Sequence, residues 1–117
     1  CNTPIQYALA EYLKNKNNYL DLGDFYRQKR DYFLKRIEKS RFKPVPALGS
    51  YFQLLDYSGI TDEADTEYSV RLTKERGIAS IPVSVFYHRP IDNKMLRFCF
   101  AKQNKTLEQA AEKLCSI

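Results

Sequence analysis

The chain has 117 residues, of which 44% are hydrophobic and 28% are charged. This length supports one compact core, and the abundance of aromatic residues excludes an intrinsically disordered chain. The net charge of +5 leaves an anionic partner open. However, acids are interleaved with the bases, and the densest basic run, 27–41, predicts a solvated helix face. We therefore expect no nucleic acid partner.

The three cysteines, Cys1, Cys99 and Cys115, show no CxxC spacing, and the single histidine, His88, is remote from them in sequence. This pattern indicates neither a zinc site nor a disulfide framework, and we expect Cys99 and Cys115 to be buried free thiols. No segment approaches the roughly 18 apolar residues that read as a membrane span, and no leader pattern is present. We expect a cytoplasmic protein that binds neither a membrane nor a metal ion. We also expect that it was cut from a longer chain, because it starts at Cys1 directly before a helix signal.

Two helices and a strand are expected in the first half of the chain. Asn2-Thr3-Pro4 is typical of a helix start, and apolar residues at helical spacing continue to Leu13. A second helix should run from about 21 or 24 to about 40. Residues 42–46 are rich in proline and predict an edge or extended segment. Residues 51–57 are the strongest strand candidate because they are aromatic and apolar and lie between turn residues.

The next segments predict a helix, a short strand and a loop. Residues 61–76 carry acids at the front and bases at the back, with Gly77 after the end, as the helix dipole and C-cap preferences require. Residues 78–81 predict a short strand that stops at Pro82. Residues 83–90 predict a loop.

The last segments complete the predicted fold. Residues 95–101 predict a strand, and Thr106 with Gln109 predicts a capping box that starts the final amphipathic helix. The order is helix, helix, strand, helix, strand, strand, helix. It predicts an α/β (α+β) sandwich in which helices cover a small mixed or antiparallel sheet.

Arg97 is the most informative residue of the last strand. Alternation along a strand places Leu96, Phe98 and Phe100 on one face and Arg97 on the other. A guanidinium among apolar neighbours is costly to bury unless an anion meets it, and its planar fork suits a carboxylate or phosphate. Two interpretations stay open on these grounds. Arg97 binds an anionic ligand, or it lies on an exposed face or pairs with an internal acid such as Asp56.

Other possible sites have weak signatures. His88 has no neighbouring nucleophile or orienting group for a general-base role. Ser50 and Ser84 lack the Gly-x-Ser-x-Gly elbow of a hydrolase. The acids within 62–67 do not have the spacing of a calcium loop, and the four separated glycines form no phosphate loop.

Four segments taken in order resemble landmarks of the class I/II aminotransferases. They are NTPIQYALA at 2–10, GSYF at 49–52, GIASIPVSVF at 77–86 and LRFCFAK at 96–102. The resemblance covers essentially the whole chain and is greatest to the methionine and kynurenine aminotransferase branch. It implies a fold-type-I enzyme in which a large domain holds pyridoxal phosphate and a C-terminal small domain closes over the substrate.

The same resemblance implies roles for individual residues. Arg97 matches the family arginine that binds the α-carboxylate of the amino acid. Tyr51, Phe52, Ser84 and Phe86 are weaker candidates for lining the mouth of the active site.

The resemblance also implies a domain organisation. Residues 1–20 would be a helix from the junction between the large and small domains, and 21–117 would be the C-terminal small domain. The lysine that holds the cofactor lies upstream in the family, in a Ser-x-x-Lys segment. The chain alone is therefore expected to bind no cofactor, to hold no catalytic residue and to be inactive.

The parent protein is expected to be a homodimeric transaminase. It would exchange amino groups between amino acid and 2-oxo acid substrates, with methionine-, kynurenine- or glutamine-like donors. Two alternatives stay open. One is a free-standing regulatory α/β module that binds an amino acid, and the other is a carbon-sulfur β-lyase of the same fold.

Overall fold

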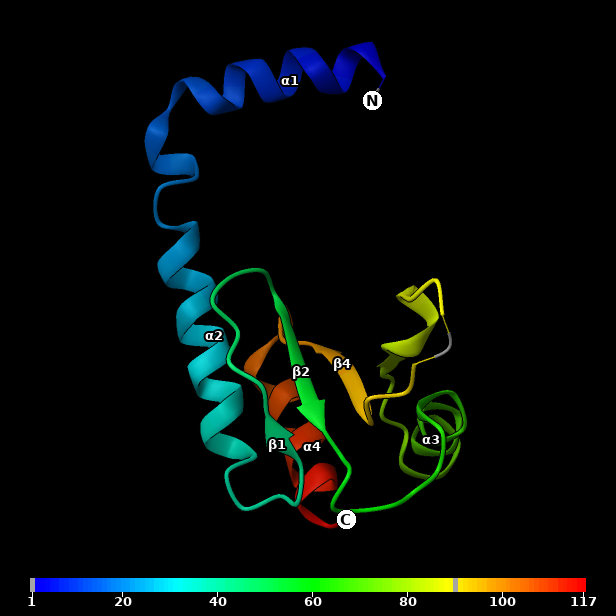
Figure 1. Cartoon of the computed structure of the whole chain (residues 1–117). Coiled ribbons are helices and arrows are strands. Elements are labelled where there is room, and N and C mark those ends of the chain that lie inside the picture. The colour runs from blue at the N-terminus through cyan, green and yellow to red at the C-terminus, as the bar shows by residue number, and fades with distance from the viewer. Residues whose placement is uncertain (1, 90) are drawn as a thin grey trace.

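The computed structural model describes residues 2–89 and 91–117 (Figure 1). The helices are α1 (Thr3–Lys14), α2 (Leu22–Arg36), α3 (Asp65–Arg71) and α4 (Asn104–Cys115), with short helical turns η1 (Lys16–Asn18), η2 (Leu72–Arg76) and η3 (Ser84–Phe86). The strands are β1 (Lys43–Pro44), β2 (Phe52–Asp56), β3 (Ile81–Pro82) and β4 (Met95–Cys99). None of the helices in these described ranges has the length and apolar character needed to cross a bilayer.

The sheet has the order β1-β2-β4-β3, and every neighbouring pair is antiparallel. Helices α2 and α4 pack against each other. Helix α3 packs beside β3 and β4, at the β3 edge of the sheet (Figure 1). The predicted α/β sandwich with a small helix-covered sheet is confirmed, and the antiparallel option is the correct one.

The core lies on one face of the central strands. On β4, Leu96 and Phe98 are buried while Arg97 is half-buried, as the alternation predicts. Opposite them on β2, Leu55 pairs with Leu96 and the buried Gln53 pairs with Phe98. The helices cover this face with side chains that include Phe33, Ile37, Leu107, Ala111 and Leu114.

Helix boundaries differ from the prediction at several places. Helix α1 starts as expected, because the Asn2 side chain accepts a hydrogen bond from Ile5 N at 3.2 Å. Helix α2 ends at Arg36 instead of about residue 40, since the chain turns there and Ser40 N bonds to Ile37 O. The helix expected from 61 begins at Asp65.

The predicted capping box at Thr106 is wrong. Helix α4 begins at Asn104, because Leu107 N already bonds to Gln103 O, so Thr106 lies inside the first turn. The short strand expected at 78–81 is also displaced, to Ile81–Pro82. Proline is tolerated there because β3 is an edge strand.

Residues 77 and 78, which precede β3, terminate the helical segment that ends with η2 and do not form a strand. Gly77 adopts φ 61°, a left-handed conformation that glycine accepts without steric cost, and Ile78 N bonds back to Leu72 O. Ile78 is buried as a result.

The cysteine prediction is only partly correct. Cys99 is half-buried on β4, but Cys115 is exposed. Leu107, Ala111 and Leu114 occupy the buried face of α4, and Cys115 lies about 100° further around the helix than Leu114. Cys1 lies outside the described residues.

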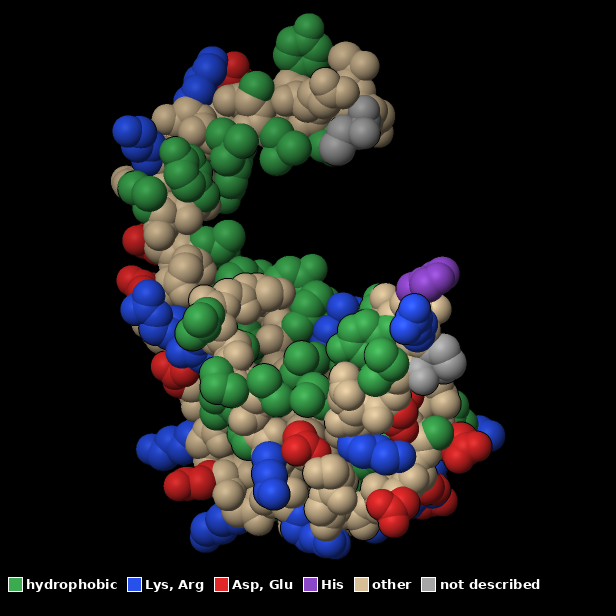
Figure 2. Space-filling model, viewed as in Figure 1, with side chains coloured by type: hydrophobic (Ala, Val, Ile, Leu, Met, Phe, Trp, Pro, Cys, Tyr) green, Lys and Arg blue, Asp and Glu red, His purple; other side chains and the backbone are tan. Residues whose placement is uncertain are grey.

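Helix α1 extends away from the body as an arm (Figure 1). The radius of gyration is 17.0 Å, against about 13 Å for a compact chain of this length. No side chain of α1 is buried, and Ile5, Leu9, Tyr12 and Leu13 are each about half exposed. Figure 2 shows apolar side chains on the side of α1 that faces the body and on the edge of the body that faces α1.

Replacing Leu96 by alanine is expected to lower the free energy of unfolding by about 2 to 5 kcal/mol, because it leaves a cavity at a fully buried position of a central strand. Leu48→Ala is the matched control, since Leu48 is 99% exposed, and its effect should stay within about 0.5 kcal/mol. Urea unfolding followed by circular dichroism measures both. Equal effects of the two substitutions would contradict this assignment of the core.

Candidate functional site

Arg97 lies in the middle of the sheet, on the face opposite the core. Its strand neighbours are Leu54 on β2 and Ile81 on β3. The backbone at this position is therefore held from both sides by sheet pairing. This rigid placement suits a side chain that must present its donors in a fixed direction.

Two aromatic rings enclose the guanidinium of Arg97. Its Cζ lies 4.1 Å from the ring centroid of Phe52 and 4.7 Å from that of Phe86. Phe52 comes from β2 and Phe86 from the turn η3, so segments far apart in sequence meet here. Contacts of this kind are favourable by about 0.5 to 2 kcal/mol, depending on how far water is removed. A guanidinium placed over aromatic rings can still bind an anion through the donors at its edge.

One hydrogen-bond donor of the Arg97 side chain has no acceptor. Its Nε is buried and has no hydrogen-bond partner, and the guanidinium forms no ion pair with any residue in the described ranges. The alternative of a pair with Asp56 is wrong. A backbone hydrogen bond from Ser58 N, at 2.7 Å, holds the Asp56 carboxylate and lowers its pKa. A buried donor without a partner costs about 1 to 3 kcal/mol, which an anionic ligand would recover.

A hollow of about 350 Å³ adjoins Arg97. Phe52 and Cys99 line it together with Arg97. The remaining lining comes from residues 77–81, from α4, and from Phe33, Phe98 and Lys102. The volume lies within the range of small-molecule sites. The candidate site thus has two cationic residues, Arg97 and Lys102, at the wall of a mostly apolar space.

A second hollow, of about 500 Å³, lies between α2 and the loop before β2. Arg27 and Arg30 line it, but each is already paired with a carboxylate, of Asp24 and Asp31 respectively. These arginines have less need of an external anion than Arg97. Tyr51 lines this second hollow, away from the hollow beside Arg97.

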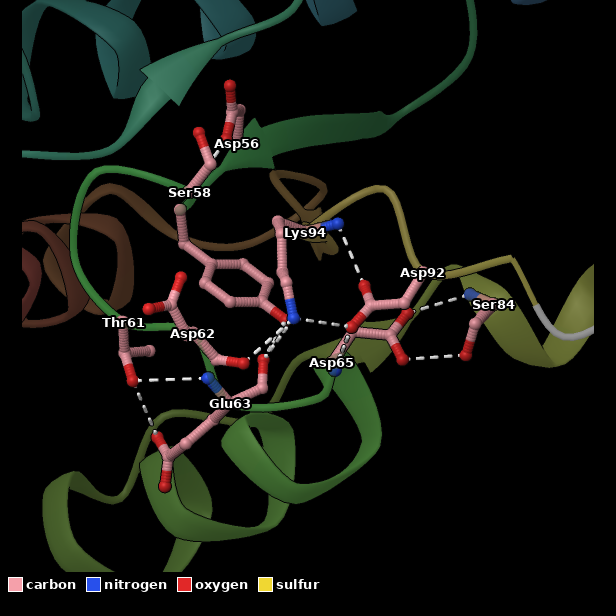
Figure 3. Close-up of polar contacts among 10 residues, drawn as sticks. Asp56, Ser58, Thr61, Asp62, Glu63, Asp65, Ser84, Asp92 and Lys94 are labelled. Carbon is pink, nitrogen blue, oxygen red and sulfur yellow. Dashed lines mark hydrogen bonds and ion pairs between the residues drawn. The ribbon is translucent and has the colours of Figure 1, made fainter.

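A polar network behind the site fixes the turn that carries Phe86 (Figure 3). Ser84 donates two hydrogen bonds to the Asp65 carboxylate, from N to Oδ2 at 2.7 Å and from Oγ to Oδ1 at 2.6 Å. Asp65 N donates to Asp92 Oδ2 at 3.1 Å. Asp92 in turn accepts hydrogen bonds from Lys94 N at 2.8 Å and from Lys94 Nζ at 3.0 Å.

Lys94 connects this network to the core. Its Nζ also donates to the carbonyl oxygens of Asp62 at 2.9 Å and Glu63 at 3.0 Å. The Glu63 carbonyl accepts a further bond from the buried Tyr57 hydroxyl at 3.0 Å. Burial raises the pKa of Tyr57, and nearby carboxylates add to this effect, so the hydroxyl stays a donor.

The Asp92 carboxylate is held in its ionised form. Burial alone raises its pKa, but hydrogen bonds from Lys94 and Asp65 N, with the charge of Lys94, outweigh burial and leave the pKa below its ordinary value.

The predicted site residues separate into two groups. Phe52 and Phe86 contact Arg97 directly. Ser84 uses its hydroxyl on Asp65, and Tyr51 lies in the other hollow.

Sequence reasoning missed the supporting group of Asp65, Asp92 and Lys94. Asp65 sits in an acidic run that a helix start explains, and Asp92 sits in a turn, so neither had a distinctive sequence signal. Within residues 2–89 and 91–117, no group of three or more His, Cys, Asp or Glu side chains is placed to hold a metal ion.

The sequence profile of the family described as aminotransferase class I and II matches residues 2–114. The chain belongs to this family. The aminotransferase resemblance drawn from four short segments is thereby confirmed.

Individual relatives agree with this assignment. Methionine aminotransferase of Escherichia coli (strain K12) is 47% identical over 97% of the chain and 30% of its own length. Kynurenine–oxoglutarate transaminase 1 of Mus musculus is 30% identical over 99% of the chain and 32% of its own length. The chain thus spans about a third of the length of these curated aminotransferases.

Solved structures show the same fold. A crystal structure from Escherichia coli, of a protein with a methionine aminotransferase function, superposes with a TM-score of 0.92 at 46% identity, covering 99% of this chain and 31% of its own. N-succinyldiaminopimelate aminotransferase of Mycobacterium tuberculosis superposes with a TM-score of 0.85 at 29% identity, covering 97% and 30%. Both superpositions cover nearly the whole of this chain.

Asp92→Asn is expected to lower the free energy of unfolding at pH 7 and to reduce its loss in acid. Because the pKa of Asp92 is lower in the folded than in the unfolded chain, its contribution is present above about pH 4 and is lost as the pH falls through the folded value. Urea unfolding between about pH 7 and pH 3 measures the difference, with the exposed Glu112→Gln as control. A difference from wild type that widens below pH 4 would contradict this role of Asp92.

Proposed function

We propose that this chain is the small domain of an amino-acid transaminase and that Arg97 binds the α-carboxylate of the substrate. The observation that carries this proposal is the buried, unpaired Nε of Arg97 between the rings of Phe52 and Phe86. Membership of the aminotransferase family supports an amino acid or 2-oxo acid as the ligand, since both carry a carboxylate at this end.

The geometry indicates how Arg97 would act. The guanidinium can donate two parallel hydrogen bonds to one carboxylate, which fixes the orientation of the ligand as well as its position. The neighbouring rings exclude water and thus strengthen the charge interaction. Holding the carboxylate also fixes the direction of the bonds at the adjacent carbon, so loss of Arg97 should weaken both binding and reaction.

Pyridoxal phosphate, the cofactor usual in this family, supplies the electron sink for amino-group exchange when bound. The residues around Arg97 do not fit as its cradle. Lys94 already donates from Nζ to three oxygens, and Lys102, which lines the hollow with Arg97, does not stand in the Ser-x-x-Lys pattern of the family's cofactor lysine. We assign cofactor binding and the cofactor lysine to the remaining part of a longer parent protein, so the chain alone is expected to be inactive.

The names of the relatives guide the choice of substrates. Methionine and kynurenine are donors implied by those names, and we propose donors of this kind, including glutamine, with a 2-oxo acid as acceptor. A carbon-sulfur β-lyase would need the same carboxylate clamp, and product analysis separates the two reactions.

We place the parent protein in the reducing cytoplasm, in keeping with the free thiol of Cys115.

We propose that residues 1–20 belong to the junction with a large domain, and 21–117 to the small domain. The exposed apolar side chains of α1 support this division, because a face of this kind is stable in water only when another surface covers it. In the parent protein the large domain and a second subunit of the homodimer would supply such surfaces.

Arg97→Ala in the full-length protein is expected to lower kcat/KM for the amino donor about 100-fold, because a charge-assisted bidentate contact contributes about 3 kcal/mol. Arg97→Lys should recover little, since lysine lacks the planar fork. Steady-state kinetics with methionine, kynurenine and glutamine measure the effect, and the exposed Arg76→Ala is the control. Unchanged donor KM and kcat in Arg97→Ala would sink the proposal.

Deleting residues 1–20 is expected to change the free energy of unfolding of the chain by less than about 1 kcal/mol, since the deleted helix has no buried side chain. The deletion should also reduce self-association, because it removes an exposed apolar face. Urea unfolding and analytical ultracentrifugation measure the two effects. Loss of cooperative unfolding in the shortened chain would show that α1 is part of the small domain instead.

A further inference from the structure

The turn η3 presents Phe86 to Arg97, and its apolar side chains are largely exposed, although Val83 directly before it is buried. Val85 is 57% exposed, Phe86 59% and Tyr87 44%. Apolar side chains exposed to this extent contribute little to fixing the backbone that carries them. The contact between the Phe86 ring and Arg97 at 4.7 Å therefore depends also on polar contacts that hold the turn.

The carboxylate of Asp65 supplies that hold. Asp65 is 2% exposed, and both of its oxygens accept hydrogen bonds from Ser84, the first residue of η3. Asp65 is also the first residue of α3, yet its side chain does not cap that helix. A buried carboxylate is costly unless its hydrogen bonds are made, so its engagement with Ser84 strongly favours this position of the turn.

Asp65 is itself fixed relative to β4. Its backbone N–H donates to Asp92, which Lys94 binds from both its backbone and its side chain. Lys94 directly precedes β4, the strand that carries Arg97. Ile81, which precedes the turn in β3, pairs directly with Arg97. The start of the turn is thus linked to β4 in two ways, through the Asp65–Asp92–Lys94 contacts drawn in Figure 3 and through the pairing of Ile81 with Arg97.

We propose that Asp65 is a positioning residue for carboxylate binding, acting through Ser84 to keep Phe86 on the guanidinium of Arg97. This inference rests on the proposed function of Arg97. Without the hold, the turn moves away, water reaches the guanidinium, and the side chain samples more orientations. Both changes weaken the interaction with a carboxylate.

Asp65→Asn and Ser84→Ala test this role to different degrees. The asparagine replaces one acceptor by an NH₂ donor, which cannot accept from Ser84. Ser84→Ala removes only the hydroxyl bond and keeps the backbone bond to Asp65. Ser69→Ala is the matched control, because Ser69 is also on α3 and its hydroxyl bonds to Ser80 O at 2.8 Å, in the segment before β3 instead of the turn.

The first measurement is steady-state kinetics of the full-length protein, with methionine, kynurenine and glutamine as donors. Asp65→Asn should raise the donor KM about tenfold and Ser84→Ala about threefold, with smaller changes in kcat, while Ser69→Ala leaves both unchanged. If Asp65→Asn does not fold, Ser84→Ala decides. A normal KM in Ser84→Ala would then overturn the inference.

A double-mutant cycle separates positioning from a general structural role. If Asp65 acts through Phe86, adding Asp65→Asn to Phe86→Ala should raise KM no further. An equal effect of Asp65→Asn in the presence and absence of Phe86 would overturn the inference. Unchanged KM and kcat in Arg97→Ala would instead sink the proposed function, whereas an impaired Arg97→Ala beside normal Asp65 and Ser84 variants would sink only the positioning role.

The second measurement does not depend on activity. Exchange of the Arg97 Nε proton with water can be followed by NMR in the ¹⁵N-labelled 117-residue chain. Asp65→Asn and Phe86→Ala should both speed this exchange about tenfold, because each uncovers the guanidinium, while Ser69→Ala leaves it unchanged. Exchange that speeds up in Phe86→Ala but not in Asp65→Asn would contradict the role of Asp65.

Discussion

The antiparallel pairing of β2 with β4 is the constraint on which the rest of the structure depends. It puts Leu96 and Phe98 against the helices and, by the two-residue period of a strand, turns Arg97 to the opposite face. The same pairing brings Phe52 alongside Arg97. A shift of register by one residue would exchange the two faces, so core packing and the position of the candidate site are specified together.

The environment of Arg97 combines two opposing demands. The side chain is enclosed enough to lose solvent from Nε, yet no partner in the described residues replaces that water. A structure tolerates such an unmet donor when a ligand supplies the missing acceptor. The surrounding polar groups show the contrast, because Asp65, Asp92 and Lys94 each have several partners and form a closed network.

Several features could be predicted because they depend on local chemistry. The strand around Arg97, the helix start at Asn2 and the helix end at Gly77 follow from side-chain alternation, capping and backbone freedom. The displaced strand at Ile81 and the early start of α4 could not be predicted in this way. Their positions depend on which backbone groups a neighbouring strand or a preceding carbonyl happens to satisfy. The exposure of Cys115 likewise follows from the rotation of α4 on the sheet.

The sequence by itself determined the aminotransferase family, the helix-covered sheet and Arg97 as the residue of interest, because each rests on residue types in a recognisable order. Only the tertiary structure decided that Phe86 covers Arg97, that Tyr51 lies in another hollow, and that Asp65 holds Ser84. Phe86 and Arg97 are 11 positions apart in the sequence, and Asp65 and Ser84 are 19 positions apart. The loops between them follow a path that is set by long-range hydrogen bonds. Local patterns do not encode such paths, since the energy that selects them appears only when the sheet and α3 are already in place.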